Sequence, residues 1–279
     1  LLSNEAPGFA FPANELEWAK QRGSGVIFSQ FAKISTLAVG IAAFLFASAA
    51  AQSVPERSLG EGPYARLVIR GVTVIDGAGA PPFGPADVVV EGGEITRIVP
   101  VGAPGLPIDA ENRPAAGERE IDASGMFLLP GFVNLHGHIH NPDDGQGVSP
   151  DYIFKLWLAH GITSVRELGN GAGAAWTSSV AARSARNEID APNIYPYPVF
   201  RGWTAGDVDT PDEARARIRQ LKRDGAVGVK FFGAPEEILW AGLEEAKKQG
   251  LKTTMHHAQL DVAHADVMDT SAHGLGSME

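Results

Sequence analysis

Residues 130–140 read Pro-Gly-Phe-Val-Asn-Leu-His-Gly-His-Ile-His, and this stretch decides how the rest of the chain is interpreted. An apolar run leads through a Pro-Gly pair into a short strand-like segment that ends at His136. In an extended strand, side chains two positions apart point to the same side, so His136 and His138 are expected to project together. Gly137 between them is expected to leave room for an ion. Imidazole is the commonest side-chain metal ligand, and two of them supply half of a tetrahedral site.

Downstream of this stretch the chain alternates helix-like and strand-like patterns, which is typical of a parallel α/β fold. Helices are expected at residues 152–160, 210–224 and 235–249, and strands at residues 162–165, 194–200, 226–232 and 251–255, with the start of another at 275–278. Thr210 and Glu213 form a capping-box pattern with proline at the first helical position. Counted from Phe132, the pattern gives five strands and the beginning of a sixth.

Upstream of the stretch, short β-rich runs follow one another from about residue 65. They cover residues 67–69, 72–75, 88–90, 95–99 and 121–125, and turn signals rich in Gly, Pro and Asp separate them. This spacing of short strands predicts a small β-sandwich subdomain at residues 64–129.

Several motifs stand in an order and spacing that resemble the amidohydrolase superfamily, in its imidazolonepropionase and prolidase-like branch. They are residues 74–77 (Val-Ile-Asp-Gly), 87–95 (Asp-Val-Val-Val-Glu-Gly-Gly-Glu-Ile), 121–125 (Ile-Asp-Ala-Ser-Gly) and 128–132 (Leu-Leu-Pro-Gly-Phe). The resemblance covers residues 65–279 and implies a β-sandwich followed by a (β/α)₈ TIM-type barrel at residues 130–279. Since such a barrel has eight strands in typically ~250 residues, we expect it to be incomplete here, with five to six strands. The resemblance also implies that His136 and His138 are metal ligands.

Lys230 lies in an apolar strand-like segment, residues 228–232. One interpretation is a lysine whose ammonium group reaches solvent. The other starts from burial, which favours the neutral amine, and a neutral amine can react with CO₂ to form an anionic carbamate. The resemblance implies the second, because a fourth-strand lysine bridges two metal ions in binuclear members of the family. Lys230 lies on the fourth strand counted from His136.

His256 and His257 follow the strand expected at residues 251–255. Alternation directs their side chains to opposite faces, so that one of them can point into the barrel. The resemblance implies a fifth-strand histidine ligand at this place. His256 is preferred, and His257 is the alternative.

Three further residues are candidates for contacts around this site. His140 continues the alternation beyond the histidine pair and is expected to support a ligand or to face substrate. Arg166 and Glu167 follow the second strand, where the resembled family usually has Arg-Asp, and local ion pairing is their expected role. The alternative for these two is an ordinary surface pair.

The end of the chain departs from the family pattern. The sixth strand of the family often carries a further histidine ligand, whereas this sequence stops at Ser277-Met278-Glu279. The eighth-strand aspartate, which binds metal and moves the proton, is also absent from the sequence. No catalytic residue is therefore assigned, and the chain alone is expected to be an incomplete catalyst.

An apolar, Ala-rich segment at residues 33–51 ends in small-x-small patterns of the kind that signal peptidase recognises. It predicts a signal peptide and a secreted or periplasmic protein, and the alternative is a membrane anchor. Residues 1–32 show no consistent period and are interpreted as an N-terminal extension of uncertain origin.

Composition narrows the function. A net charge of −10 without a basic block argues against a nucleic-acid partner, and the absence of cysteine excludes disulfides and thiolate metal sites. The resemblance implies a hydrolase that cleaves C–N amide bonds of small cyclic or dipeptide-like substrates, with one or two Zn²⁺ or other transition-metal ions, in a protein that could form homo-oligomers. The alternatives are a deaminase or phosphotriesterase-like activity on the same scaffold, or an inactive fragment.

Overall fold

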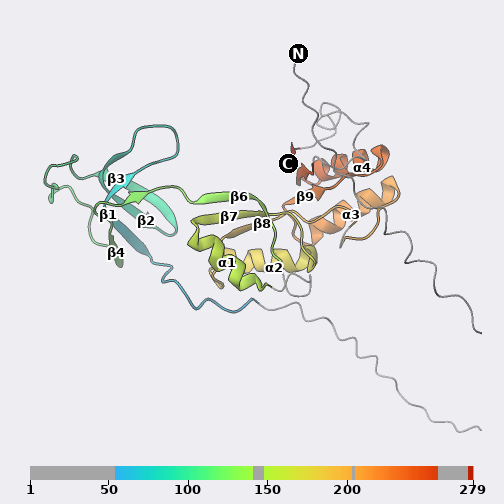
Figure 1. Cartoon of the computed structure of the whole chain (residues 1–279), viewed down its shortest axis with the longest axis horizontal. Helices are drawn as coiled ribbons and strands as arrows, with labels where there is room; N and C mark the ends of the chain where they lie inside the picture. The colour runs from blue at the N-terminus through green and yellow to red at the C-terminus, as the bar shows by residue number, and fades with distance from the viewer. Residues whose placement is uncertain (1–53, 141–147, 203–204, 257–275, 279) are drawn as a thin grey trace, which may run out of the picture. The chain divides into compact units, whose positions relative to one another are not determined.

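The computed structural model describes residues 54–140, 148–202, 205–256 and 276–278 (Figure 1). The expected N-terminal extension and signal peptide lie outside these residues. The first part is built from β1 (Arg66–Val74), β2 (Phe83–Glu91), β3 (Glu94–Pro100), β4 (Arg119–Asp122) and β5 (Phe127–Leu128). The second part is built from β6 (Phe132–Gly137), α1 (Pro150–Ala159), β7 (Ile162–Glu167), α2 (Gly173–Ala185), β8 (Asn193–Pro196), α3 (Pro211–Arg223), β9 (Gly228–Phe231), α4 (Glu236–Lys248), β10 (Lys252–Met255) and β11 (Ser277–Met278).

The first part is a five-stranded mixed sheet in the order β3-β2-β1-β4, with β5 also paired to β1. The two strands expected at residues 67–69 and 72–75 are one strand, because the β1–β2 ladder continues past a register irregularity between Ile69 and Val72. Gly71 allows this irregularity, since its φ of 69° is rarely adopted by other residues. The described residues hold one sheet in this region, so the second layer of the expected sandwich stays a prediction.

Asp87 on β2 is completely buried and holds the first sheet together electrostatically. Its carboxylate accepts hydrogen bonds from Nε and Nη2 of Arg113, both at 2.9 Å, from Nη1 of Arg70 at 2.8 Å, and from the Gly71 amide at 2.9 Å. Burial by itself raises the pKa of Asp87, but the hydrogen bonds from these donors outweigh it and lower the pKa from 3.8 to about 2. The carboxylate is therefore ionised whenever the sheet is folded near neutral pH.

The strands of the second part are parallel and follow one another in chain order, β6-β7-β8 in one sheet and β9-β10-β11 in the next. The two sheets are joined edge to edge at Lys230, which bridges to Val199, donates its amide to Pro198 O at 2.9 Å and accepts from Phe200 N at 2.8 Å. Alternating parallel strands and helices confirm the expected α/β class.

A side-chain contact between β7 and β11 shows that these strands do not lie flat. Arg166 Nη1 on β7 donates to Ser277 Oγ on β11 at 3.2 Å, and Ser277 Oγ lies 2.9 Å from Thr254 Oγ1 on β10. In a flat sheet, strands four positions apart would be separated by about 19 Å, well beyond the reach of an arginine. The strands must therefore curve so that their side chains meet on the inner face.

The helices begin where the sequence supplies caps. In α3, Thr210 Oγ1 accepts from Glu213 N at 3.3 Å while Glu213 Oε2 accepts from Thr210 N at 3.1 Å, which confirms the expected capping box. The first helix, α1, begins earlier than expected because Ser149 Oγ accepts from Tyr152 N. In the described ranges, each helix is too short or too polar to span a membrane.

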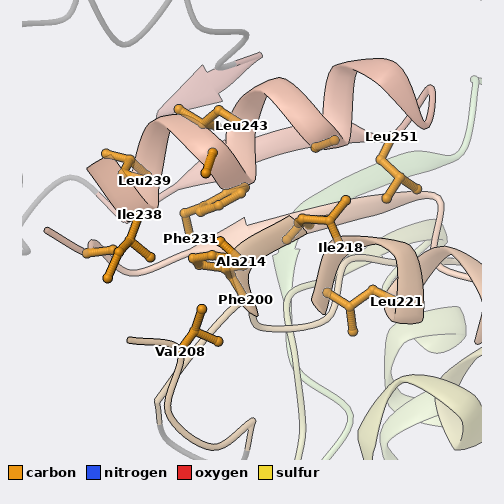
Figure 2. Packing of buried hydrophobic residues seen from close by; sticks show 14 of the residues in the cluster. Phe200, Val208, Ala214, Ile218, Leu221, Phe231, Ile238, Leu239, Leu243 and Leu251 are labelled. Carbon is orange, nitrogen blue, oxygen red and sulfur yellow. The ribbon is translucent and has the colours of Figure 1, made fainter. Parts of the chain in front are cut away.

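An apolar cluster joins α3 and α4 to the strand β9 (Figure 2). The rings of Phe200 and Phe231 lie 4.7 Å apart in this cluster, which also contains Leu239 and Leu243 of α4. Complete burial of a side chain of this size contributes about 1.5–3 kcal/mol to folding. Because Phe231 faces the helices, its neighbour Lys230 faces the other side of the sheet.

Replacing Asp87 with asparagine should lower the free energy of unfolding by about 3–5 kcal/mol at neutral pH, because two guanidinium groups lose a buried ionised partner. The folded-state pKa of Asp87 lies below 3.8, so its charge stabilises the fold above about pH 4, and this contribution is lost as the pH falls toward 2. Urea unfolding across this pH range measures both effects, with the exposed carboxylate variant Asp207→Asn as control. Equal acid sensitivity of the parent and Asp87→Asn would contradict the assignment.

Candidate metal-binding site

A β-bulge shapes the strand that carries the histidine motif. Asn134 pairs with Val165 and Gly137 pairs with Glu167, so β6 has one more residue than β7 between the two pairs. The His136 amide donates to the side-chain Oδ1 of Asn134 at 3.0 Å. A bulge changes the direction in which the neighbouring side chains point, and bulges are common next to active sites.

The histidines of this segment lie side by side. The ring centroids of His136 and His138 are 5.3 Å apart, and those of His138 and His140 are 5.7 Å apart. His138 Nδ1 lies 2.9 Å from the carbonyl oxygen of Gly169. Because a carbonyl can only accept, Nδ1 carries the proton in this contact and the lone pair of a neutral ring is on Nε2. Such a bond through the other ring nitrogen is typical of a metal-ligating histidine.

Gly137 was expected to leave room for an ion, but the structure gives a different reason for a glycine here. A Cβ at this position would lie 2.5 Å from Cγ1 of Val165 and 3.4 Å from the indole of Trp157 on α1. This side of β6 faces the helix, whereas the neighbouring histidines are on the other side. Gly137 therefore allows close packing of β6 against Val165, and its expected place beside an ion stays a prediction.

Lys230 is completely buried, so its ammonium group does not reach solvent. Its Nζ lies 5.4 Å from the centroid of the Phe232 ring, which also lies 5.5 Å from the His256 ring. Lys230 and His256 thus contact the same aromatic side chain. This local arrangement brings the expected fourth- and fifth-strand ligands to one place.

His256 follows β10 directly, and its amide donates to the carbonyl of Phe231 at 2.9 Å. Its ring Nδ1 is buried and has no hydrogen-bond partner within the described part of the chain. Buried polar atoms almost always have a partner, so this nitrogen is suited to a ligand. The alternative residue, His257, lies outside the described residues.

The expected ligands are therefore seen as two pairs: His136 with His138, and Lys230 with His256. Among the residues that the structure describes, no three His, Cys, Asp or Glu side chains are arranged to hold a metal ion. The assignment of all four as ligands of a shared site stays a prediction.

Arg166 and Glu167 occupy opposite faces of β7, and their expected role in local ion pairing stays a prediction. Arg166 faces the inner side, where Nε donates to the carbonyl of Leu135 at 2.7 Å and the guanidinium carbon lies 5.5 Å from the Tyr197 ring centroid. Glu167 is buried on the helix side and borders a cavity of about 120 Å³ with Thr177 of α2. Arg166 contacts the strand that carries the histidines through its side chain, whereas Glu167 pairs with that strand through its backbone.

Sequence reasoning missed four residues that contact these groups: Asn134, Tyr197, Phe232 and Ser277. Asn134 and Phe232 each stand two positions from an expected ligand, so alternation alone could have suggested them. Tyr197 and Ser277 approach through contacts between distant strands, for which the sequence offers no local signal.

The chain is similar in sequence to known hydrolases, although no family model matches it. It is 29% identical over 214 residues to a dihydroorotase from Trichlorobacter lovleyi, which covers 73% of this chain and 45% of the relative. It is 32% identical over 152 residues to an N-acyl-D-aspartate deacylase from Alcaligenes xylosoxydans xylosoxydans, which covers 53% of this chain and 26% of the relative. The chain thus spans less than half the length of these relatives.

The fold is also similar to solved structures. A Xaa-Pro dipeptidase with bound methionine in its active site aligns with a TM-score of 0.59 at 19% identity. The alignment covers 76% of this chain and 61% of that chain. At this identity the likeness shows the fold alone.

Replacing Gly137 with alanine should destabilise the protein by about 1–3 kcal/mol, because the new methyl group overlaps the stiff side chain of Val165. The matched control is Gly102→Ala, where an added Cβ meets its nearest atom at 3.4 Å. Thermal unfolding of the metal-free proteins measures the difference. An unchanged melting temperature for Gly137→Ala would show that the close approach of β6 and β7 is not required.

Proposed function

We propose that the chain belongs to the amidohydrolase superfamily and that the whole protein is a metal-dependent hydrolase of C–N amide bonds. Two relatives bear the names dihydroorotase and N-acyl-D-aspartate deacylase, which supports this class of reaction. The parallel, curved β/α strands of this chain are then an arc of a (β/α)₈ barrel. The expected ligands lie in the last residues of β6 and β9 or just after β6 and β10, at the carboxyl ends where such barrels hold their active sites.

The observation that carries the proposal is the arrangement of the histidines. His138 and His136 lie side by side, and the Nδ1 contact of His138 with Gly169 leaves Nε2 as a donor to a cation. The buried Nδ1 of His256, without a partner in the described ranges, suits the same role. With no cysteine in the chain, the donor set of imidazoles and a modified lysine fits zinc or another transition metal.

A divalent ion bound there would lower the pKa of a bound water molecule and would polarise the carbonyl group of the amide that is cleaved. His136 and His138 would hold the ion from the first strand of the arc, and His256 would hold it from the fifth. Lys230 would act as a carbamate: its neutral amine would form a bond to the carbon of CO₂, release a proton to water and become an anion with two oxygen ligands. The complete burial of Lys230 disfavours the charged ammonium and so favours the neutral amine. Proton transfer to the leaving amine is assigned to no residue of this chain.

The substrates that fit this proposal are small cyclic amides, N-acyl amino acids and dipeptide-like amides. The test is to purify the whole protein, measure its zinc content, and assay hydrolysis of dihydroorotate, an N-acyl-D-aspartate and an Xaa-Pro dipeptide. Zinc-dependent hydrolysis of any of these substrates would support the proposal. Zinc-free protein, or hydrolysis that is unchanged after chelation, would contradict it.

Replacing Lys230 with alanine should lower the metal content and abolish hydrolysis, because the variant could not form the proposed carbamate ligand. Added acetate or propionate should partly restore both, since a short carboxylate can occupy the space of the missing side chain. Lys252→Ala, which removes an exposed lysine from β10, is the matched control. Full metal content in Lys230→Ala, measured by elemental analysis, would rule out a role for this lysine as a ligand.

We also propose that the protein is exported, since residues 33–51 have the pattern of a signal peptide. Cleavage is expected between about residues 49 and 52 in a secreting host. N-terminal sequencing of the exported protein checks this. Exported protein that retains the apolar segment would instead favour a membrane anchor.

A further inference from the structure

The bulge in β6 leaves two backbone groups outside the regular ladder, and two side chains satisfy them. Asn134 Oδ1 accepts from the amide of His136 at 3.0 Å, and Arg166 Nε donates to the carbonyl of Leu135 at 2.7 Å. These groups belong to the same peptide unit, because the Leu135 carbonyl and the His136 amide share one bond. The orientation of that peptide plane is thus fixed from both ends.

The peptide plane matters because His136 itself is exposed, so packing does not restrict its ring strongly. The direction of its Cα–Cβ bond follows from the backbone, and the backbone of a bulge is not held by the ladder. A ligand displaced by a fraction of an ångström loses the distance that a metal bond requires, about 2.0–2.1 Å for zinc and imidazole. Fixing the peptide plane therefore fixes the imidazole.

Arg166 is suited to this task because its guanidinium is held on its other side. Nη1 donates to Ser277 Oγ at 3.2 Å, and the group lies against the ring of Tyr197. A planar guanidinium with several directed donors is more rigid than a lysine ammonium. The carbonyl of Leu135 is thereby tied to strands β8 and β11 as well as to β7.

We propose that Asn134 and Arg166 are positioning residues that aim His136 at the metal ion. This inference rests on the proposed metal site. Neither residue needs to touch the ion or the substrate. Their effect passes through one peptide bond, so their loss should change the geometry and affinity of metal binding more than the stability of the metal-free fold.

The experiment compares the whole protein with Asn134→Ala and Arg166→Ala. Zinc affinity is measured by competition with a chelator, ligand geometry by the visible spectrum of the Co²⁺ form, and the fold by circular dichroism and melting of the metal-free protein. We expect zinc to bind about 10- to 100-fold more weakly and the Co²⁺ spectrum to change, with the metal-free melting temperature nearly unchanged. The matched controls are Asn193→Ala and Arg223→Ala, both at exposed positions.

Conservative variants separate this role from a structural one. Asn134→Asp keeps the acceptor for the His136 amide and should retain parent-like affinity, whereas Arg166→Lys lacks the fork and should bind zinc more weakly. If the alanine variants do not fold, the test uses Asn134→Asp and Arg166→Lys instead. Weaker zinc binding by Asn134→Asp than by Arg166→Lys would then overturn the proposal. If both alanine variants keep the zinc affinity and the Co²⁺ spectrum of the parent, the positioning role is overturned while the metal site stands. A parent protein that binds no zinc would overturn the metal site and this inference with it.

Discussion

The curvature of the parallel sheet brings distant strands within reach of one guanidinium group, that of Arg166. This group joins Leu135 on β6, Tyr197 after β8 and Ser277 on β11, which are segments that a flat sheet would keep far apart. Because these contacts lie on the side away from the helices, the polar side chains of different strands face a common interior. The helix side, in contrast, is packed mainly with apolar residues, with Glu167 and Thr177 buried among them.

The sequence predicted the α/β elements where the signals were local. The capping box of Thr210 and Glu213 is complete within four residues, and α3 begins there as expected. The helix α2 was not predicted, because its sequence is rich in Ala, Ser and Thr and buries only Thr177, Val180 and Ser184, which is a weak apolar stripe. Whether the strands close into a full barrel depends on pairing between segments far apart in sequence, which periodicity does not report.

For the candidate site, alternation correctly predicted that His136 and His138 are neighbours, since this depends on one strand. Alternation did not predict the bulge in β6 at His136. A bulge is defined by the pairing register of two strands, so the sequence of one strand alone does not reveal it. The packing role of Gly137 was missed for the same reason: the atom that excludes a side chain there belongs to Val165 on β7. The metal-ligand assignments themselves come from resemblance and stay predictions.

The network around Asp87 has a consequence for how the chain would respond to a protease. Residues 102–112, between β3 and β4, are exposed and have no regular secondary structure, which makes them a preferred region for cleavage. Arg113, just beyond them, is bound to Asp87 on β2, and β4 is paired with β1. A single cut in this segment would therefore divide the polypeptide without separating the two pieces, and the nicked protein would migrate as one species until it is denatured.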